Sequence, residues 1–220
     1  MPFQSLHSWQ VSAQEAIAIQ ESLRPKVTRE DHLGLVQTVA GVDVGFEADG
    51  TITRAAVVVL RYPELEPVET SIARCPTTFP YIPGLLSFRE APAALEALDR
   101  LRALPDLLFC DGQGIAHPRR LGLASHLGLC TGLPSIGAAK SRLIGRHEPL
   151  GELRGDYQHL WDAGEVIGAA LRTRPGVRPL YVSIGHRISL ETAIQLVLSC
   201  TRVYRLPEPT RQAHHLASLR

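Results

Sequence analysis

The segment Val39–Phe46 limits what this chain can fold into more than any other. If it forms a strand, its alternating side chains divide between two faces, one with Val42, Val44 and Phe46 and the other with Gly41, Asp43 and Gly45. Asp is disfavoured inside a strand and Gly weakens one, so three such residues on one face indicate a role other than strand stability. We interpret this face as open space in front of a carboxylate, where a metal ion or a substrate backbone can approach closely. A bulge or barrel corner with a solvated Asp43 fits the segment equally well.

The composition is typical of a soluble globular protein, and we expect a single domain over residues 1–220. Of the 220 residues, 45% are hydrophobic and 20% are charged, and no apolar run approaches the roughly 18 residues of a membrane span. The formal net charge is only +1, so a nucleic acid would have to meet a local basic patch. The four cysteines stand apart without a C-x-x-C pair, which disfavours a zinc ribbon or a disulfide framework. We therefore expect a cytoplasmic monomer with reduced thiols, no leader peptide and no membrane contact.

Local patterns outline the order of the elements. A capping box at Ser12–Glu15 opens a helix that closes near Pro25. Three strands joined by short turns follow and form an antiparallel meander, with expected ranges 39–46, 55–60 and 68–75. A helical segment then precedes an apolar strand at 107–110, which favours parallel pairing for that strand. Weaker patterns predict a helix near 121–129, strands near 135–137, 166–171 and 180–182, and a helix at about 190–200.

This order resembles the ribonuclease H-like fold, an α/β fold in which a mixed sheet of three antiparallel strands and then parallel strands is flanked by helices. In that fold the first and fourth strands are neighbours, so Asp43 and Asp111 would lie close together. Neighbouring strands are about 4.8 Å apart, which lets two carboxylates share one divalent cation.

The proline-rich segment Pro80–Gly84 cannot be a helix interior or a central strand, because its two prolines lack N–H donors and have a fixed φ. We predict a stiff loop that presents Tyr81 and Ile82. Apolar side chains on stiff loops unstack base steps in several DNA-binding proteins, so Pro80, Tyr81, Ile82 and Pro83 form a candidate wedge. The alternative is a rigid surface turn whose aromatic ring packs back into the core.

Glu90 follows this loop and has two interpretations. With Ser87 it matches a capping box, in which its carboxylate would only bond the backbone of Ser87. Pro92 argues against that interpretation, because it would break an internal hydrogen bond of a helix that is capped at Ser87. We therefore expect the helix to begin near Glu90, with Pro92 in its first turn and the Glu90 carboxylate free.

Residues 111–120 follow the fourth strand directly. Two glycines near the start of this segment permit close backbone approach. Positive charge beside Asp111 is expected from His117, Arg119 and Arg120. The third glycine of a dinucleotide fingerprint is missing, so we predict no nucleotide cofactor.

Seven motifs taken together resemble one family, endonuclease V, the deoxyinosine 3′ endonucleases. The resemblance runs from about residue 10 to residue 215 in family order, without a departure at an acidic position. The motifs are Val-Asp-Val-Gly at 42–45, Pro-Tyr-Ile-Pro-Gly-Leu-Leu-Ser-Phe-Arg-Glu at 80–90, Asp-Gly-Gln-Gly-Ile-Ala-His-Pro-Arg at 111–119, Gly-Leu-Ala-Ser-His-Leu-Gly at 122–128, Gly-Ala-Ala-Lys-Ser at 137–141, Ser-Ile-Gly-His at 183–186 and Pro-Thr-Arg-Gln-Ala-His at 209–214.

The resemblance implies a DNA repair enzyme that uses Mg²⁺, or Mn²⁺ in its place. Such an enzyme hydrolyses the second phosphodiester bond 3′ to a deoxyinosine and leaves a 3′ hydroxyl and a 5′ phosphate. The implied metal ligands are Asp43, Glu90 and Asp111, and Lys140 and His214 join them as catalytic residues. Without the motifs, Lys140 would be interpreted as a solvated surface lysine and His214 as an ordinary tail histidine.

The resemblance also assigns substrate contacts. The wedge falls on residues 80–83, and main-chain groups at Gly84, Leu86 and Gly112 would hold the flipped base. Candidate DNA contacts are Arg89, His117 and Arg119. The expected partner is DNA that contains deoxyinosine, and inosine-containing RNA is a second candidate substrate.

Two rival functions stay open. A junction resolvase or another nuclease of the same fold would share the acids but has no use for a Tyr81 wedge or a base pocket. A non-catalytic nucleic-acid binder on the same scaffold would not need Asp43, Glu90 and Asp111 intact.

Overall fold

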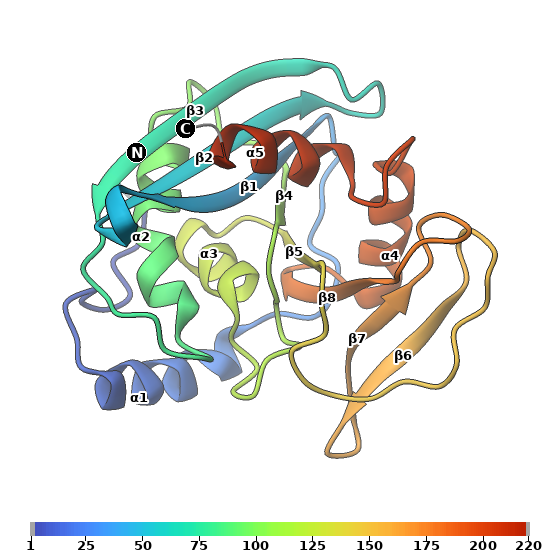
Figure 1. Cartoon of the computed structure of the whole chain (residues 1–220), viewed down its shortest axis with the longest axis horizontal. Helices are drawn as coiled ribbons and strands as arrows, with labels where there is room; N and C mark the ends of the chain where they lie inside the picture. Colours follow the sequence, from blue (N-terminus) through green and yellow to red (C-terminus); the bar gives the residue numbers. More distant parts are fainter. Residues whose placement is uncertain (1–2, 219–220) are drawn as a thin grey trace.

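The computed structural model describes residues 3–218, which form one mixed sheet between two layers of helices (Figure 1). The two ends of the expected domain, residues 1–2 and 219–220, lie outside the described residues. The sheet has eight strands in the order β3-β2-β1-β4-β5-β8-β7-β6. The ribonuclease H-like arrangement predicted from the sequence is confirmed.

The first five strands follow the predicted plan. The meander consists of β1 (Thr38–Glu47), β2 (Ile52–Arg61) and β3 (Pro67–Pro76), each antiparallel to the next. The apolar β4 (Leu107–Cys110) pairs in parallel with β1, and β5 (Ser135–Ala139) pairs in parallel with β4. The first and fourth strands are therefore neighbours, as expected.

Parallel pairing stops at β5. The strand β8 (Leu180–His186) is antiparallel to β5, β7 (Glu165–Leu171) is antiparallel to β8, and β6 (Tyr157–Asp162) is antiparallel to β7. A two-residue turn joins β6 to β7, and both of its residues have positive φ, 51° at Ala163 and 79° at Gly164. Two positive φ values are typical of the type I′ turn that reverses a chain within a hairpin. The mainly polar and aromatic β6 was not predicted from the sequence.

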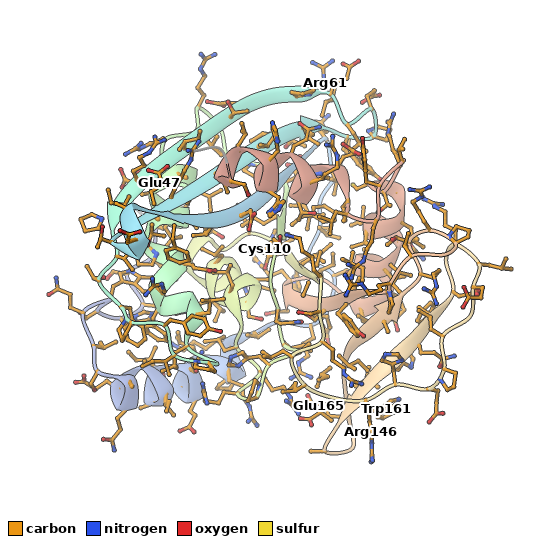
Figure 2. All side chains as sticks on the ribbon, viewed as in Figure 1. Glu47, Arg61, Cys110, Arg146, Trp161 and Glu165 are labelled. Atoms are coloured by element: carbon orange, nitrogen blue, oxygen red, sulfur yellow. The ribbon has the colours of Figure 1, made fainter. Side chains whose placement is uncertain are left out.

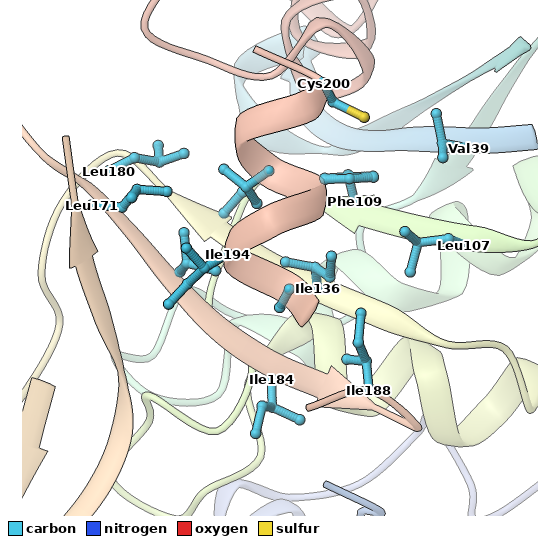
Figure 3. Close-up of a cluster of buried hydrophobic side chains, with 14 of the residues drawn as sticks. Val39, Leu107, Phe109, Ile136, Leu171, Leu180, Ile184, Ile188, Ile194 and Cys200 are labelled. Atoms are coloured by element: carbon cyan, nitrogen blue, oxygen red, sulfur yellow. The ribbon is translucent and has the colours of Figure 1, made fainter. Parts of the chain in front are cut away.

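Helices cover both faces of the sheet (Figure 1). An apolar cluster joins one face to α2 (Leu86–Asp99) and α3 (Leu123–Thr131). A second cluster, shown in Figure 3, joins the other face to α4 (Leu190–Ser199) and α5 (Glu208–Ser218). The helix α1 (Ala13–Leu23), which begins with the predicted capping box, packs beside the start of α2, and the short 3₁₀ turns are η1 (Arg24–Lys26) and η2 (Ala48–Gly50).

The helix α5 lies directly on the glycine-containing face of β1. A Cβ atom at Gly41 would lie 1.9 Å from the carbonyl oxygen of Pro209, and one at Gly45 would lie 2.5 Å from that of Ala217. The glycine positions on this face are therefore not open space, because a helix backbone fills the space that the two glycines leave. The same close approach brings α5 to the Asp43 side chain.

The start of α2 differs from both sequence interpretations. The helix begins at Leu86, so Glu90 is inside it, and Pro92 also lies inside the helix. The capping box is absent, because Ser87 is helical and its Oγ bonds the ring of His126 at 3.0 Å. Pro92 cannot donate to the carbonyl of the fourth residue before it. The helix continues nevertheless because its apolar side is buried against the sheet, with Ala91, Ala94 and Leu98 inaccessible.

Two further features concern membranes and thiols. Within residues 3–218, no helix combines the length and the apolar character that crossing a membrane requires. All four cysteines are free thiols, and three of them are buried.

We predict that Gly41→Ala destabilises the protein. The new methyl group would meet main-chain atoms of α5, which cannot rotate away as a side chain can. Overpacking typically costs about 1–3 kcal/mol, which for a protein of this size lowers the melting temperature by roughly 2–12 °C. Gly34→Ala is the matched control, because nothing lies within 4 Å of a Cβ at Gly34. Equal melting temperatures of the two variants in a calorimetric scan would contradict the packing argument.

Candidate active site

Two aspartates meet because β1 and β4 are parallel neighbours. The register pairs Val42 with Cys110, so Asp43 and Asp111 follow at the same level of the sheet. The amide of Asp111 donates to the carbonyl of Val42 at 3.0 Å, which fixes the backbone where β4 ends. Both carboxylates are largely enclosed, with side-chain exposures of 10% for Asp43 and 11% for Asp111.

His214 and Lys140 complete the cluster. His214 lies on α5, and its Nδ1 is 2.7 Å from Asp43 Oδ2 and 4.0 Å from Asp111 Oδ2. Lys140 directly follows β5, and its Nζ contacts Asp111 Oδ2. Lys140 Nζ also lies 3.2 Å from His214 Nδ1. Because a carboxylate only accepts, the short contact is His214 Nδ1–H donating to Asp43. The same nitrogen then cannot accept from the Lys140 ammonium, so Asp111 is the partner of Lys140.

Burial and mutual repulsion act on the acids. Burial raises the pKa of Glu90 to about 8, and the charges of Asp43 and Asp111 add to the effect. The pKa of Asp43 is raised as well, first by burial and then by Asp111, while the hydrogen bond from His214 acts in the opposite direction. Three acids that repel one another at one place are stabilised when a cation joins them.

The two carboxylates of the donor set fit a hard divalent cation. Ligand atoms of Asp43, Asp111 and His214 all lie within 4.8 Å of one another. This spread suits an ion whose oxygen ligands stand about 2.0–2.6 Å away, and a His214 nitrogen joins them only where it carries no proton. The family resemblance implies that Glu90 is the third metal ligand. Among the described residues, the compact group of possible ligands contains His214 and not Glu90. Glu90 remains close enough for Asp43 and Asp111 to influence its pKa.

A cavity of about 140 Å³ lies beside the acids. It brings together six of the residues predicted for the wedge and the base pocket: Tyr81, Ile82, Pro83, Gly84, Leu86 and Gly112. The Tyr81 side chain at its edge is 70% exposed, so the alternative in which this ring packs into the core is wrong. The next residue, Ile82, is half-buried and packs against a cluster that includes Phe79 and Phe88.

The carbonyl of Gly84 is held from three sides. It accepts hydrogen bonds from Gln20 Nε2 at 3.0 Å, His117 Nε2 at 2.9 Å and Arg119 Nη2 at 2.7 Å. Burial, with the charge of Arg119 adding to it, lowers the pKa of His117 to about 4, so this histidine is neutral at pH 7. The expectation that His117 supplies positive charge beside Asp111 is therefore wrong.

The arginines near the site are also engaged in holding loops. Arg89 donates to the carbonyls of Phe79 at 3.0 Å and Gly50 at 3.3 Å. Arg120 forms ion pairs with Asp162 at 2.8 Å and Glu165 at 2.7 Å, so its charge is neutralised away from Asp111. The roles of Arg89, His117 and Arg119 as DNA contacts stay predictions.

Sequence reasoning missed several residues around the cavity. Gln20 was assigned to a structural helix, although a buried glutamine on an otherwise apolar helix side is a usable signal. Gln113, inside the motif that follows β4, lines the cavity and donates from Nε2 to the carbonyl of Ser141 at 3.0 Å. Leu143 also lines the cavity, but its loop offers no periodic pattern that would have singled it out.

Comparison with known proteins identifies the family. The sequence profile of Endonuclease V matches residues 21–215. This chain belongs to the endonuclease V family. An endonuclease V from Trichormus variabilis is 62% identical over 215 residues, which cover 97% of each chain.

Solved structures of endonuclease V agree with this one. That from Streptomyces avermitilis is 44% identical, covers 96% of this chain and 93% of its own, and has a TM-score of 0.91. The structure from Ciona intestinalis is a complex with a 24mer DNA containing an inosine followed by a ribo-adenosine. It is 32% identical, covers 93% of this chain and 95% of its own, and has a TM-score of 0.82. Members of the endonuclease V family are nucleases, so hydrolysis of a phosphodiester bond is the chemistry that the acid cluster has to explain.

We predict a pH-dependent stability that Glu90 causes in the metal-free protein. The folded state keeps a proton on Glu90 up to a pKa of about 8, whereas the unfolded chain releases it above about 4.5. The unfolded state therefore binds fewer protons between these values, and the stability that Glu90 contributes falls as pH rises through this window. Glu90→Gln should flatten the decline, by at most about 1.4 kcal/mol per pH unit.

The measurement is the melting temperature between pH 5 and 8.5 in the presence of a chelator. Glu96→Gln on the same helix is the control, because Glu96 is exposed and paired with Arg100 at 3.0 Å. Parallel pH profiles of the wild type and Glu90→Gln would show that Glu90 does not hold its proton in the folded state.

Proposed function

We propose that this member of the endonuclease V family cleaves DNA at deoxyinosine. The cut falls at the second phosphodiester bond 3′ to the lesion and leaves a 3′ hydroxyl and a 5′ phosphate. The observation that carries the proposal is the adjacency of Asp111 and Gly112, because one belongs to the acid cluster and the next lines the cavity. A base that enters the cavity would keep the sugar-phosphate backbone of its nucleotide near the acids. The Ciona intestinalis protein, which is 32% identical, has been solved with inosine-containing DNA.

Divalent-metal catalysis is part of the proposal. When bound, Mg²⁺, or Mn²⁺ in its place, activates water and neutralises charge on the phosphate. Asp43 and Asp111 would hold the ion together with Glu90 or His214. His214 is oriented by its hydrogen bond to Asp43, and Lys140 would contact the phosphate once its bond to Asp111 is loosened by the ion.

The cavity supports the choice of base. Its volume of about 140 Å³ is small compared with the roughly 300–1,000 Å³ of typical ligand pockets, which fits a flat base better than a whole nucleotide. Hypoxanthine carries an acceptor oxygen where adenine carries an amino donor. Leu86 is the first residue of α2, so its N–H has no acceptor within the helix and is available to that oxygen. The amide of Gly112 already donates to Cys110 at 2.9 Å and is the weaker candidate.

The biological setting follows as further proposals. We expect residues 1–220 to act as one domain, because the single sheet takes strands from Thr38 to His186. We expect a monomeric cytoplasmic repair enzyme, with inosine-containing RNA as a second substrate.

The deciding experiment is a nicking assay with mapped products. Matched duplexes with deoxyinosine or adenine, an inosine-containing RNA and a four-way junction are each tested with Mg²⁺, Mn²⁺ or a chelator. We expect cleavage of the inosine duplex only with metal, at the second bond 3′ to the base. Preferential cleavage of the junction, or binding without cleavage, would favour the rival functions.

We predict that Asp43→Ala and Asp111→Ala abolish nicking while affinity for inosine DNA largely survives. The reason is that both acids face the metal position and do not line the cavity. Single-turnover cleavage and equilibrium binding are measured on the same duplex. Cleavage by either variant at nearly the wild-type rate with Mg²⁺ would refute the metal site. Glu148→Ala is the control, because Glu148 is exposed and outside the cluster.

We predict that Tyr81→Ala weakens binding of inosine duplex by roughly ten- to a hundredfold. Base–aromatic stacking is worth about 1–3 kcal/mol, and about 1.4 kcal/mol corresponds to one decade of affinity. Inosine in single strands, which is already unstacked, should lose least. The melting temperature should change little because the ring is exposed. Equal losses on duplex and single strand would remove the wedge role from Tyr81.

A further inference from the structure

Three aromatic side chains form a row on the edge strand β6, which we call the aromatic ladder: Tyr157, His159 and Trp161. The ring centroids of Tyr157 and His159 are 5.7 Å apart, and those of His159 and Trp161 are 6.3 Å apart. Tyr157 is 42% exposed and Trp161 is 45% exposed. The core contact of this strand is made by Leu160, which is buried against Ala116 and Ile167. The exposed rings are therefore not required to hold β6 in place.

Exposed aromatic rings on an edge strand favour unwanted association, so a sequence that keeps them without a structural need indicates a binding role. In Figure 1 the β6–β7 turn lies at the bottom of the molecule, and Figure 2 labels Arg146 and Trp161 there.

A basic loop connects the proposed active site to the ladder. It begins at Lys140 beside Asp111 and continues through Arg142 to Arg146, both of which are exposed. Arg146 and Trp161 exchange two backbone hydrogen bonds, of 2.9 Å and 2.8 Å. Six residues span at most about 22 Å, so the ladder begins within that distance of the Lys140 backbone.

The middle of this loop touches both sites. Leu143 lines the proposed base cavity, while Ile144 packs against Leu160 of β6. A groove of about 410 Å³ follows at the β6–β7 turn, lined by Arg146, His147 and Trp161 among others. The proposed base pocket, the basic loop and the aromatic ladder therefore form one continuous path.

The acids near this path are largely compensated. Asp162 pairs with Arg120, and Glu165 pairs with both Arg120 and Arg29. The basic loop itself carries one acid, Glu148, and three cations, Lys140, Arg142 and Arg146. Cations interleaved with flat exposed rings match a polymer of phosphates and unpaired bases.

We propose that the aromatic ladder binds a single-stranded part of the substrate, with bases stacked on Tyr157 and Trp161 and phosphates held by Arg142 and Arg146. This proposal rests on the proposed function, because it treats the ladder as an extension of the inosine site. A strand advances about 3.4 Å per nucleotide in B-form, so the ladder is reached within at most about six nucleotides of the proposed site. An unpaired segment beside the lesion therefore adds affinity that a fully paired duplex does not receive.

The test compares inosine strands of two lengths. A short strand has about three nucleotides on each side of the inosine and covers less of the path to Trp161, and the long strands carry about ten more on the 5′ or the 3′ side. Trp161→Ala and Tyr157→Ala should each weaken binding of one class of long strand by roughly 5- to 100-fold. Binding and nicking of the short strand should change least.

Tyr204→Ala is the matched control, because Tyr204 is 54% exposed but lies outside the ladder. Direct contact is read from Trp161 fluorescence in a Trp9→Phe background, which removes the other of the two tryptophans. Stronger quenching by long than by short strands is expected. Melting temperatures of all variants show that the fold is intact, since neither ring contributes to the buried core.

The outcomes separate the two proposals. If the wild type does not nick inosine DNA, the proposed function fails, while fluorescence with long strands still tests the ladder. If ladder variants bind long strands as tightly as the wild type, the ladder proposal fails with the function intact. Concentration-dependent dimerisation that Trp161→Ala abolishes would also overturn it, because the ladder would then be an interface between two copies of the chain.

Discussion

The site depends on how closely α5 packs against β1. Gly41 and Gly45 remove the two side chains that would hold the helix away, so the main chain of α5 lies on the strand. Between these contacts, His214 meets Asp43 at 2.7 Å. A helix at an ordinary distance would place the imidazole out of reach of both aspartates. The two glycines therefore act as positioning residues for the acid cluster, although neither belongs to it.

Recognition and chemistry share the loop after β4. Asp111 belongs to the acid cluster, Gly112 lines the cavity, and His117 supports Gly84 on the opposite wall. A displacement of this loop would move the proposed metal ligand and the proposed base pocket together. Arg120 limits such movement by pairing with Asp162 and Glu165 of the β6–β7 hairpin. These ion pairs therefore help to fix the proposed base pocket relative to the proposed metal site.

The order of the strands, through its resemblance to the ribonuclease H-like fold, was sufficient to predict that β1 and β4 are neighbours, and the closeness of Asp43 and Asp111 follows from that. The predictions that failed depended on packing partners that the sequence does not show. The glycines of β1 were interpreted without α5, because no periodic pattern predicted that helix. The start of α2 was predicted from local proline rules, but burial of the apolar side of the helix outweighs them. The neutral state of His117 follows from desolvation, which a sequence does not display. The edge strand β6 carries too few apolar residues to be recognised.

Under the proposed function, the support of the Gly84 carbonyl by Gln20 makes the first helix part of the wall of the base pocket. Gln20 is 1% exposed and also donates to the carbonyl of Leu121 at 3.1 Å, so α1 holds the cavity wall from behind while standing apart from the carboxylates. If the cavity holds the base as proposed, mutations that reshape α1 would alter base choice before they alter hydrolysis. Lesion preference could then change in evolution while the cutting reaction stays constant, because different parts of the chain support the two.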